Sequence, residues 1–163
     1  VEARVAEAVA GGARVLTGGR RSRRLKAGFF YEPTILVDVR PEMRIVATET
    51  FGPTMPIMKV RGIEQAIAMA NAQEYGLGAN IYTNNMEWAM TAMERITSGT
   101  FWINDPLTDN EAGPFGGMKK TGHSRELGVE GLDEFRETKH VHLDWKQEVK
   151  PYWYPYEKYN RSR

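Results

Sequence analysis

Two segments of this chain place residues that could do chemistry beside residues that fix the backbone. The first is Glu49-x-Phe51-Gly52-Pro53, where a carboxylate stands two positions before an aromatic ring. An ionised carboxylate offers two acceptor oxygens, which suits a ligand with two neighbouring hydroxyls. The same pattern also fits a turn in which Gly52-Pro53 breaks the chain and Phe51 is a core residue. On its own, this segment does not choose between the two interpretations.

The second segment, residues 113–128, joins several glycines and a proline to one aromatic residue and ends in an Arg-Glu pair followed by Leu-Gly. It reads Gly-Pro-Phe-Gly-Gly-Met-Lys-Lys-Thr-Gly-His-Ser-Arg-Glu-Leu-Gly, with the aromatic ring at Phe115. Glycine adopts backbone angles that other residues avoid and allows close approach of chain or ligand. The segment therefore predicts a loop of defined shape. Its glycine spacing is not that of a dinucleotide-binding Gly-x-Gly-x-x-Gly loop.

Taken together and in this order, the two segments resemble the C-terminal part of the NAD(P)-dependent aldehyde dehydrogenases. In that family Glu-x-Phe-Gly-Pro, Pro-Phe-Gly-Gly and Gly-Arg-Glu-Leu-Gly recur. The resemblance covers essentially the whole chain. It implies that Glu49 holds the nicotinamide ribose, that Phe51 lies beside the nicotinamide and that Phe115 lines the aldehyde tunnel. The chain departs from the usual pattern at Ser124, where glycine is commoner, and at Thr121, where serine is frequent.

The resemblance also implies a structural pair of residues. Arg125 belongs to the Arg-Glu of the family signature, and Glu137-Thr138-Lys139 matches the family's Glu-x-Lys. That glutamate typically bonds to the signature arginine near the subunit interface, so we expect a contact between Arg125 and Glu137. A buried bidentate pair of this kind is costly to break on one side only.

Cysteine is absent from the chain, yet enzymes of this family attack the aldehyde with a cysteine. The family reaction runs from thiolate attack to a thiohemiacetal, then to hydride transfer to NAD(P)+ and release of the carboxylic acid. We therefore expect a C-terminal fragment with no catalytic residues of its own, lacking the nucleophile, the glutamate base and the Rossmann-like cofactor domain. Such a fragment is predicted to be inactive alone and to bind NAD or NADP poorly.

Two other functions stay open at this point. The chain could be a truncated, non-catalytic paralogue that assembles with full-length subunits as an oligomerisation partner. A stand-alone nucleotide-binding module using Glu49 is less favoured, because the fold that holds most of the dinucleotide is absent. Neither the aldehyde nor the choice between NAD and NADP follows from these residues.

Acidic residues precede the glycine-rich segment at Asp105, Asp109 and Glu111. Carboxylates near a substrate mouth would favour a cationic aldehyde, such as betaine aldehyde or an aminoaldehyde. The alternative is a solvated loop whose aspartates cap turns.

Composition argues against several classes of function. In 163 residues, apolar side chains make up 41% and charged ones 26%, which is typical of a soluble globular domain. No apolar run is long enough to span a membrane and no signal segment is visible, so we expect a cytoplasmic protein without membrane partners. The net charge is +1 and the basic run over residues 20–26 lacks interleaved aromatics, so no nucleic acid is expected. The three histidines supply no convincing ligand set, so no metal is expected.

The order of secondary-structure elements predicts the fold class. Apolar periodicity predicts helices over 1–10, 43–48, 62–73, 85–97 and 129–137, the fourth capped by Asn84. It predicts strands over 13–17, 29–39, 55–60, 79–83, 100–104 and 139–145. This alternation indicates an α/β fold, a parallel sheet with flanking helices.

The resemblance divides the chain in two. We expect residues 1–138 to form part of the aldehyde dehydrogenase catalytic domain and residues 139–163 to form an oligomerisation strand with an aromatic tail. A homo-oligomer that acts on an aldehyde is therefore expected. A sheet that is cut along a strand leaves an unpaired edge, so the isolated chain is also expected to self-associate.

Overall fold

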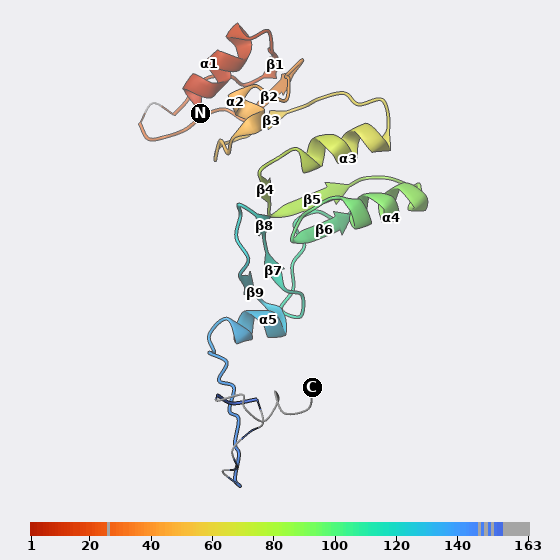
Figure 1. Cartoon of the computed structure of the whole chain (residues 1–163). Helices are drawn as coiled ribbons and strands as arrows, with labels where there is room; N and C mark the ends of the chain where they lie inside the picture. Colours follow the sequence, from red (N-terminus) through yellow and green to blue (C-terminus); the bar gives the residue numbers. More distant parts are fainter. Residues whose placement is uncertain (26, 147, 149, 151, 155–163) are drawn as a thin grey trace.

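The computed structural model describes residues 1–25, 27–146, 148, 150 and 152–154. Its helices are α1 (Glu2–Ala10), α2 (Arg44–Ala47), α3 (Ile63–Asn71), α4 (Met86–Arg95) and α5 (Gly128–Asp133). Its strands are β1 (Arg14–Thr17), β2 (Thr34–Val37), β3 (Thr54–Pro56), β4 (Tyr75–Gly76), β5 (Gly78–Ile81), β6 (Thr100–Ile103), β7 (Phe115–Gly116), β8 (Met118–Lys119) and β9 (Arg125–Glu126). Helices and strands are interspersed along the chain, in agreement with the predicted α/β class (Figure 1). Two expected features lie partly outside the described residues, the basic run at Lys26 and the C-terminal tail at residues 147, 149, 151 and 155–163.

The first part of the chain builds a small layered unit around the main apolar core. β1 pairs antiparallel with β2, and β2 pairs parallel with β3. The apolar residues of α1 recur at helical spacing, so Val5 and Ala8 are buried while the charged positions stay outside. They belong to one cluster with Leu36 of β2 and Ile45 of α2. This unit carries Glu49 on the loop that follows α2.

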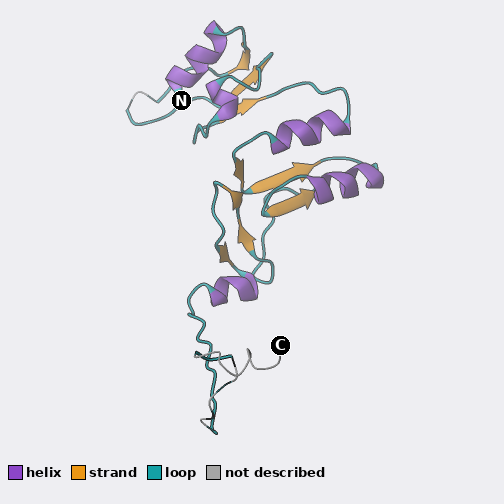
Figure 2. Ribbon diagram, viewed as in Figure 1, coloured by secondary structure: helices purple, strands orange, loops and turns teal. Residues whose placement is uncertain are grey.

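The second part contains the parallel strands β5 and β6, joined through α4, with α3 in contact with α4. Two short antiparallel pairs, β4 with β8 and β7 with β9, hold the glycine-rich segment, and α5 follows it (Figure 2). The units succeed one another along an elongated path instead of closing around one core.

The expected single parallel sheet is not present. In the described residues the strands form one three-stranded and three two-stranded sheets, and β3 does not pair with β5. Parallel pairing occurs where a helix lies between two strands, at β2–β3 with α2 and at β5–β6 with α4. Local periodicity predicts the strands themselves, whereas neighbours in a sheet are chosen by contacts between distant segments.

Two local predictions need correction at the level of single residues. The cap of α4 is Asn85 and not Asn84, because Asn85 Oδ1 accepts a hydrogen bond from Trp88 N at 3.1 Å. The strand expected over 29–39 is shortened to β2. Pro33, which has no amide N–H to give to a sheet, stands directly before that strand.

The strand expected over 139–145 does not form in the described chain. The backbone there has no partner strand, and the chain runs away from the body of the molecule (Figure 1). Val141 and Leu143 are exposed. An oligomerisation strand at this place stays a prediction about an assembled protein.

Large apolar side chains are open to solvent along much of the molecule. Phe29, Phe51 and Phe135 have exposed fractions above nine-tenths, at 101%, 92% and 91%. Among the described residues of the second part, the buried apolar side chains are Ile67, Ala89 and Ala92, which is a small core for two helices and two strands. No helix in the described part of the chain is long and apolar enough to cross a bilayer.

This exposure leads to the first prediction, that residues 1–163 produced alone self-associate at micromolar concentration. Burying apolar surface between copies is favourable at roughly 25 cal/mol per Å², and surfaces this apolar mark interaction sites or aggregation. Sedimentation velocity over a concentration series measures the effect. A single monomeric species throughout would contradict it.

A close contact between backbone segments holds the glycine-rich segment in place. Gly99 lies in the turn before β6, and its N–H donates to the carbonyl oxygens of Gly76 and Leu77, both at 3.1 Å. On its other side Gly99 touches Gly116, and a Cβ at Gly99 would overlap the Gly116 carbonyl oxygen. Because that obstacle is backbone, no side-chain rotation can relieve it.

We predict that Gly99→Ala destabilises the protein expressed from its complete gene by about 1–3 kcal/mol, the usual range for overpacking. The added methyl group must push β7 away from the turn before β6. Gly113→Ala is the matched control, since a Cβ there meets only Asn110 Oδ1 at 3.9 Å and should change stability by less than about 0.5 kcal/mol. Urea unfolding midpoints compare the two variants, and equal midpoints would refute the prediction.

Candidate functional site

The Glu49 motif, residues 49–53, lies on the loop after α2, and Arg4 of α1 binds this loop. The Arg4 guanidinium donates to Thr48 O and to Thr50 Oγ1, each at 3.1 Å, and also to Glu49 O. Phe51 adopts a left-handed backbone with φ 48°, which is uncommon for a bulky residue. Phe51 is 92% exposed, so its interpretation as a core residue is wrong for the described chain.

Glu49 lines a cleft of about 430 Å³ to which both parts of the chain contribute residues. The lining residues come from the end of α2, from the region between α3 and β5 and from the glycine-rich segment; they are Val46, Thr48, Glu49, Gln73, Tyr75, Leu77, Lys120 and Thr121. Lys120 Nζ lies 2.7 Å from a carboxylate oxygen of Glu74. That hydrogen bond and charge raise the pKa of Lys120 above its ordinary value, so the amine stays protonated. The cleft thus holds an acceptor carboxylate and a cation.

Phe115 faces a second cleft, of about 330 Å³, formed by the glycine-rich segment itself. β7 and β9 pair antiparallel, with Phe115 opposite Glu126, and this pairing sets the shape of the cleft. Its lining residues are Leu77, Phe115, Gly116, Gly117, Thr121, Gly122, His123, Ser124, Arg125 and Glu126. Leu77 and Thr121 therefore line both clefts, so the two clefts share a wall.

Arg125 binds backbone carbonyl groups of its own loop and not the expected glutamate. Its Nη1 donates to three backbone carbonyl oxygens, of Gly117 at 2.8 Å, Ser124 at 2.9 Å and His123 at 3.0 Å. The predicted contact with Glu137 is not formed in the described chain. α5 ends at Asp133, and the following residues lead Glu137 away into solvent.

The glycine-rich segment is tied to β4 and α3 by residues that the sequence patterns did not single out. β8 pairs with β4, and Lys119 Nζ donates to the carbonyl oxygens of Asn71 at 3.1 Å and Gln73 at 3.0 Å. The Asn71 side chain donates to Arg95 O at 2.7 Å and accepts from Thr97 N at 2.8 Å, so it joins the ends of α3 and α4. An asparagine at a helix end is a known termination signal and could have been noticed.

The acidic residues Asp105, Asp109 and Glu111 are exposed and line neither cleft. Their segment is held by backbone contacts, with Trp102 Nε1 donating to Thr108 O at 3.1 Å and Gly128 N donating to Glu111 O at 2.9 Å. This geometry gives no support to a preference for cationic aldehydes.

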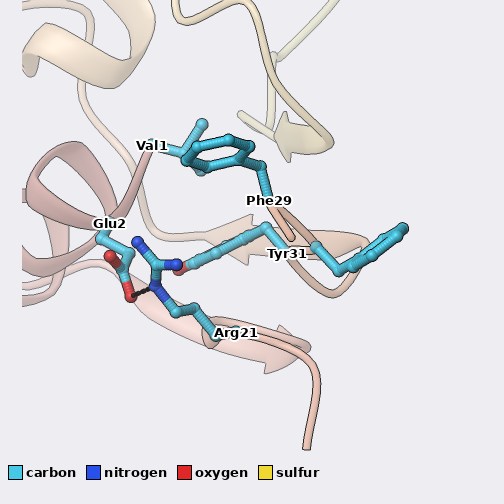
Figure 3. A pocket seen from close by; sticks show the side chains of 6 residues that line it. Val1, Glu2, Arg21, Phe29 and Tyr31 are labelled. Atoms are coloured by element: carbon cyan, nitrogen blue, oxygen red, sulfur yellow. Dashed lines mark hydrogen bonds and ion pairs between the residues drawn. The ribbon is translucent and has the colours of Figure 1, made fainter. Parts of the chain in front are cut away.

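A third hollow, of about 210 Å³, lies at the start of α1 and is mostly apolar. Figure 3 shows the Phe29 ring beside Val1, and Arg21 Nε donating to Glu2 Oε1 at 3.1 Å. Burial, and secondly the charge of Glu2, raise the pKa of Tyr31 above its ordinary value. Arg20 and Arg21 of the basic run are each paired with a glutamate. In the described part of the chain no group of three or more metal-ligating side chains comes together.

Known proteins are similar to this chain in sequence and in fold. The family model described as "Aldehyde dehydrogenase family" matches residues 1–141. Succinate-semialdehyde dehydrogenase [NADP(+)] of Deinococcus radiodurans is 40% identical over 86% of this chain and 29% of its own length. Among solved structures, lactaldehyde dehydrogenase from Escherichia coli superposes with a TM-score of 0.82 at 41% identity, covering 87% of this chain and 29% of that one.

A further structure, a variant of betaine aldehyde dehydrogenase from Staphylococcus aureus in complex with NAD+, has a TM-score of 0.84 at 34% identity. It matches 93% of this chain and 31% of that protein. The chain thus spans less than a third of the length of the relatives it matches. Family model, sequence identity and structural superposition agree, and the chain belongs to the aldehyde dehydrogenase family.

Proposed function

We propose that this chain is the C-terminal part of an enzyme that oxidises an aldehyde to a carboxylic acid with NAD(P)+. The observation that carries the proposal is the shared wall between the Glu49 cleft and the Phe115 cleft. A dehydrogenase must hold its cofactor and its aldehyde next to each other, and two adjoining clefts with the matching residues provide that arrangement.

The residues of the Glu49 cleft fit the ribose end of a dinucleotide. Within the described chain no hydrogen bond or ion pair engages the Glu49 carboxylate, so both oxygens are available to a diol. The exposed Phe51 ring offers a flat apolar face two residues further along. When bound, the dinucleotide supplies the hydride acceptor. Glu49 then orients the ribose, Phe51 covers the neighbouring ring, and Phe115 contacts the aldehyde.

The nucleophile of the proposed reaction has to come from elsewhere, since the chain contains no cysteine. Thiohemiacetal chemistry therefore needs a further part of the protein, and residues 1–163 alone are inactive in this proposal. Residues 1–138 contribute to the catalytic domain, and residues 139–163 contribute an oligomerisation strand and tail in a cytoplasmic homo-oligomer.

The names of the similar proteins do not select the aldehyde or the cofactor. They include succinate semialdehyde, lactaldehyde and betaine aldehyde, and both NADP+ and NAD+.

The second candidate function is a non-catalytic paralogue that assembles with full-length subunits. The exposed apolar surface favours such assembly. Turnover by the protein expressed from its complete gene and purified free of other dehydrogenase subunits separates the two, because the paralogue alone would oxidise no aldehyde.

In that complete protein, we predict that Glu49→Gln raises the KM for NAD+ or NADP+ about tenfold. Losing a charge-assisted hydrogen bond costs at least about 1.4 kcal/mol, which corresponds to this factor. Glu94→Gln makes the same change at an exposed position of α4 that neither cleft includes, and it should leave the KM unchanged. Steady-state kinetics at saturating aldehyde measures both variants. An unchanged KM in Glu49→Gln would remove Glu49 from the cofactor site.

A further inference from the structure

The hydroxyl and the γ-methyl group of Thr121 contact two different backbone segments. Its Oγ1 accepts a hydrogen bond from Gly76 N in β4 at 2.9 Å. Its γ-methyl group lies against Gly117, where an added Cβ would overlap it. Gly117 follows β7, which carries Phe115, while β4 borders the Glu49 cleft. One side chain therefore connects the walls of both clefts.

The Thr121 side chain has little conformational freedom in this position. Threonine is branched at Cβ, so few χ1 rotamers are open to it. Gly76 and Gly117 are both buried, and a buried N–H without an acceptor costs about 1–3 kcal/mol. Displacing Thr121 would break the bond to Gly76 and the contact with Gly117 together.

We infer that Thr121 is a positioning residue that fixes the spacing between the Glu49 cleft and the Phe115 cleft. The inference rests on the proposed function and adds to it a residue that acts through the two backbone segments it connects. Reactions between two bound partners are sensitive to displacements of about 1 Å. Thr121 therefore acts on the rate of the chemical step more than on the binding of either partner.

The test uses Thr121→Val in the protein expressed from its complete gene, since valine keeps the shape and removes the acceptor. We expect kcat to fall about tenfold, with both KM values within about twofold of the unsubstituted protein. The kinetic isotope effect on kcat, measured with an aldehyde deuterated at the carbonyl carbon, should rise as hydride transfer becomes slower. Amide hydrogen exchange at Gly76, measured without cofactor, should accelerate about tenfold.

Two further variants keep the test decisive. Thr121→Ser keeps the hydroxyl and loses only the methyl contact, so kcat should fall about threefold, with an isotope effect between those of the unsubstituted protein and Thr121→Val. If Thr121→Val does not fold, Thr121→Ser tests the inference instead, and an unchanged kcat and isotope effect in Thr121→Ser would overturn it.

Thr100→Val is the matched control. Thr100 Oγ1 is buried without a hydrogen-bond partner in the described chain, so kcat should not change and the unfolding midpoint should be equal or higher.

Failure of the inference and failure of the proposed function are distinguishable. If the unsubstituted protein oxidises no aldehyde with NAD+ or NADP+, the proposed function fails. If it is active and Thr121→Val loses activity only in proportion to the loss of folded protein, with unchanged isotope effect, Thr121 is merely structural and the inference is wrong.

Discussion

The arrangement of the site depends on one constraint, the close approach of three backbone segments around Gly99, Gly116 and Gly76. Gly99 binds the carbonyl of Gly76 on one side and touches the carbonyl of Gly116 on the other, with no space for a side chain between them. Contacts between main chains do not adjust by rotamer changes, so this region behaves like a packed interior although solvent is near. The position of β7, and with it Phe115, is consequently fixed relative to β4 and to the wall of the Glu49 cleft.

The charged residues around this junction bind backbone more than they bind each other. Lys119 donates to carbonyls at the end of α3, where the helix dipole favours a cation, and Arg125 donates to three carbonyls of its own loop. Lys120 is held by Glu74. With these cations engaged, the Glu49 carboxylate has no partner within the described chain and faces an open cleft. The nearby cations are therefore satisfied by other partners, whereas the Glu49 carboxylate is not one end of an ion pair in the described chain, and this difference supports the proposal that it binds a ligand.

Sequence patterns predicted the elements that depend on the residues of one segment alone. The periodicity of α1 and α3 and the glycines after α1 placed these helices within one or two residues, because spacing along one segment determines them. The sheet arrangement was not predictable in this way, since β3 and β5 are consecutive strands that do not pair. Arg125 shows the same limit at the site. The family resemblance implied a contact with Glu137, but α5 ends at Asp133 and Arg125 binds carbonyl groups of its own loop. The clefts around Glu49 and Phe115 could be anticipated from motifs, whereas their shared wall at Thr121 depends on β4 pairing with β8.

The backbone of Phe51 bears on whether the site exists before a ligand binds. A left-handed conformation at a bulky residue costs about 1–3 kcal/mol and persists only when its surroundings impose it. Here the imposing contacts come from Arg4 of α1, which binds the two residues before and after Glu49 and the Glu49 carbonyl itself. These contacts involve no ligand and no atom of the glycine-rich segment. The loop shape is therefore set by the packing of α1 on the first unit, which supplies the carboxylate of the Glu49 cleft. The opposite wall of that cleft includes β4, which is linked to the Phe115 side by its pairing with β8, by the Gly99 contacts and by the hydrogen bond to Thr121.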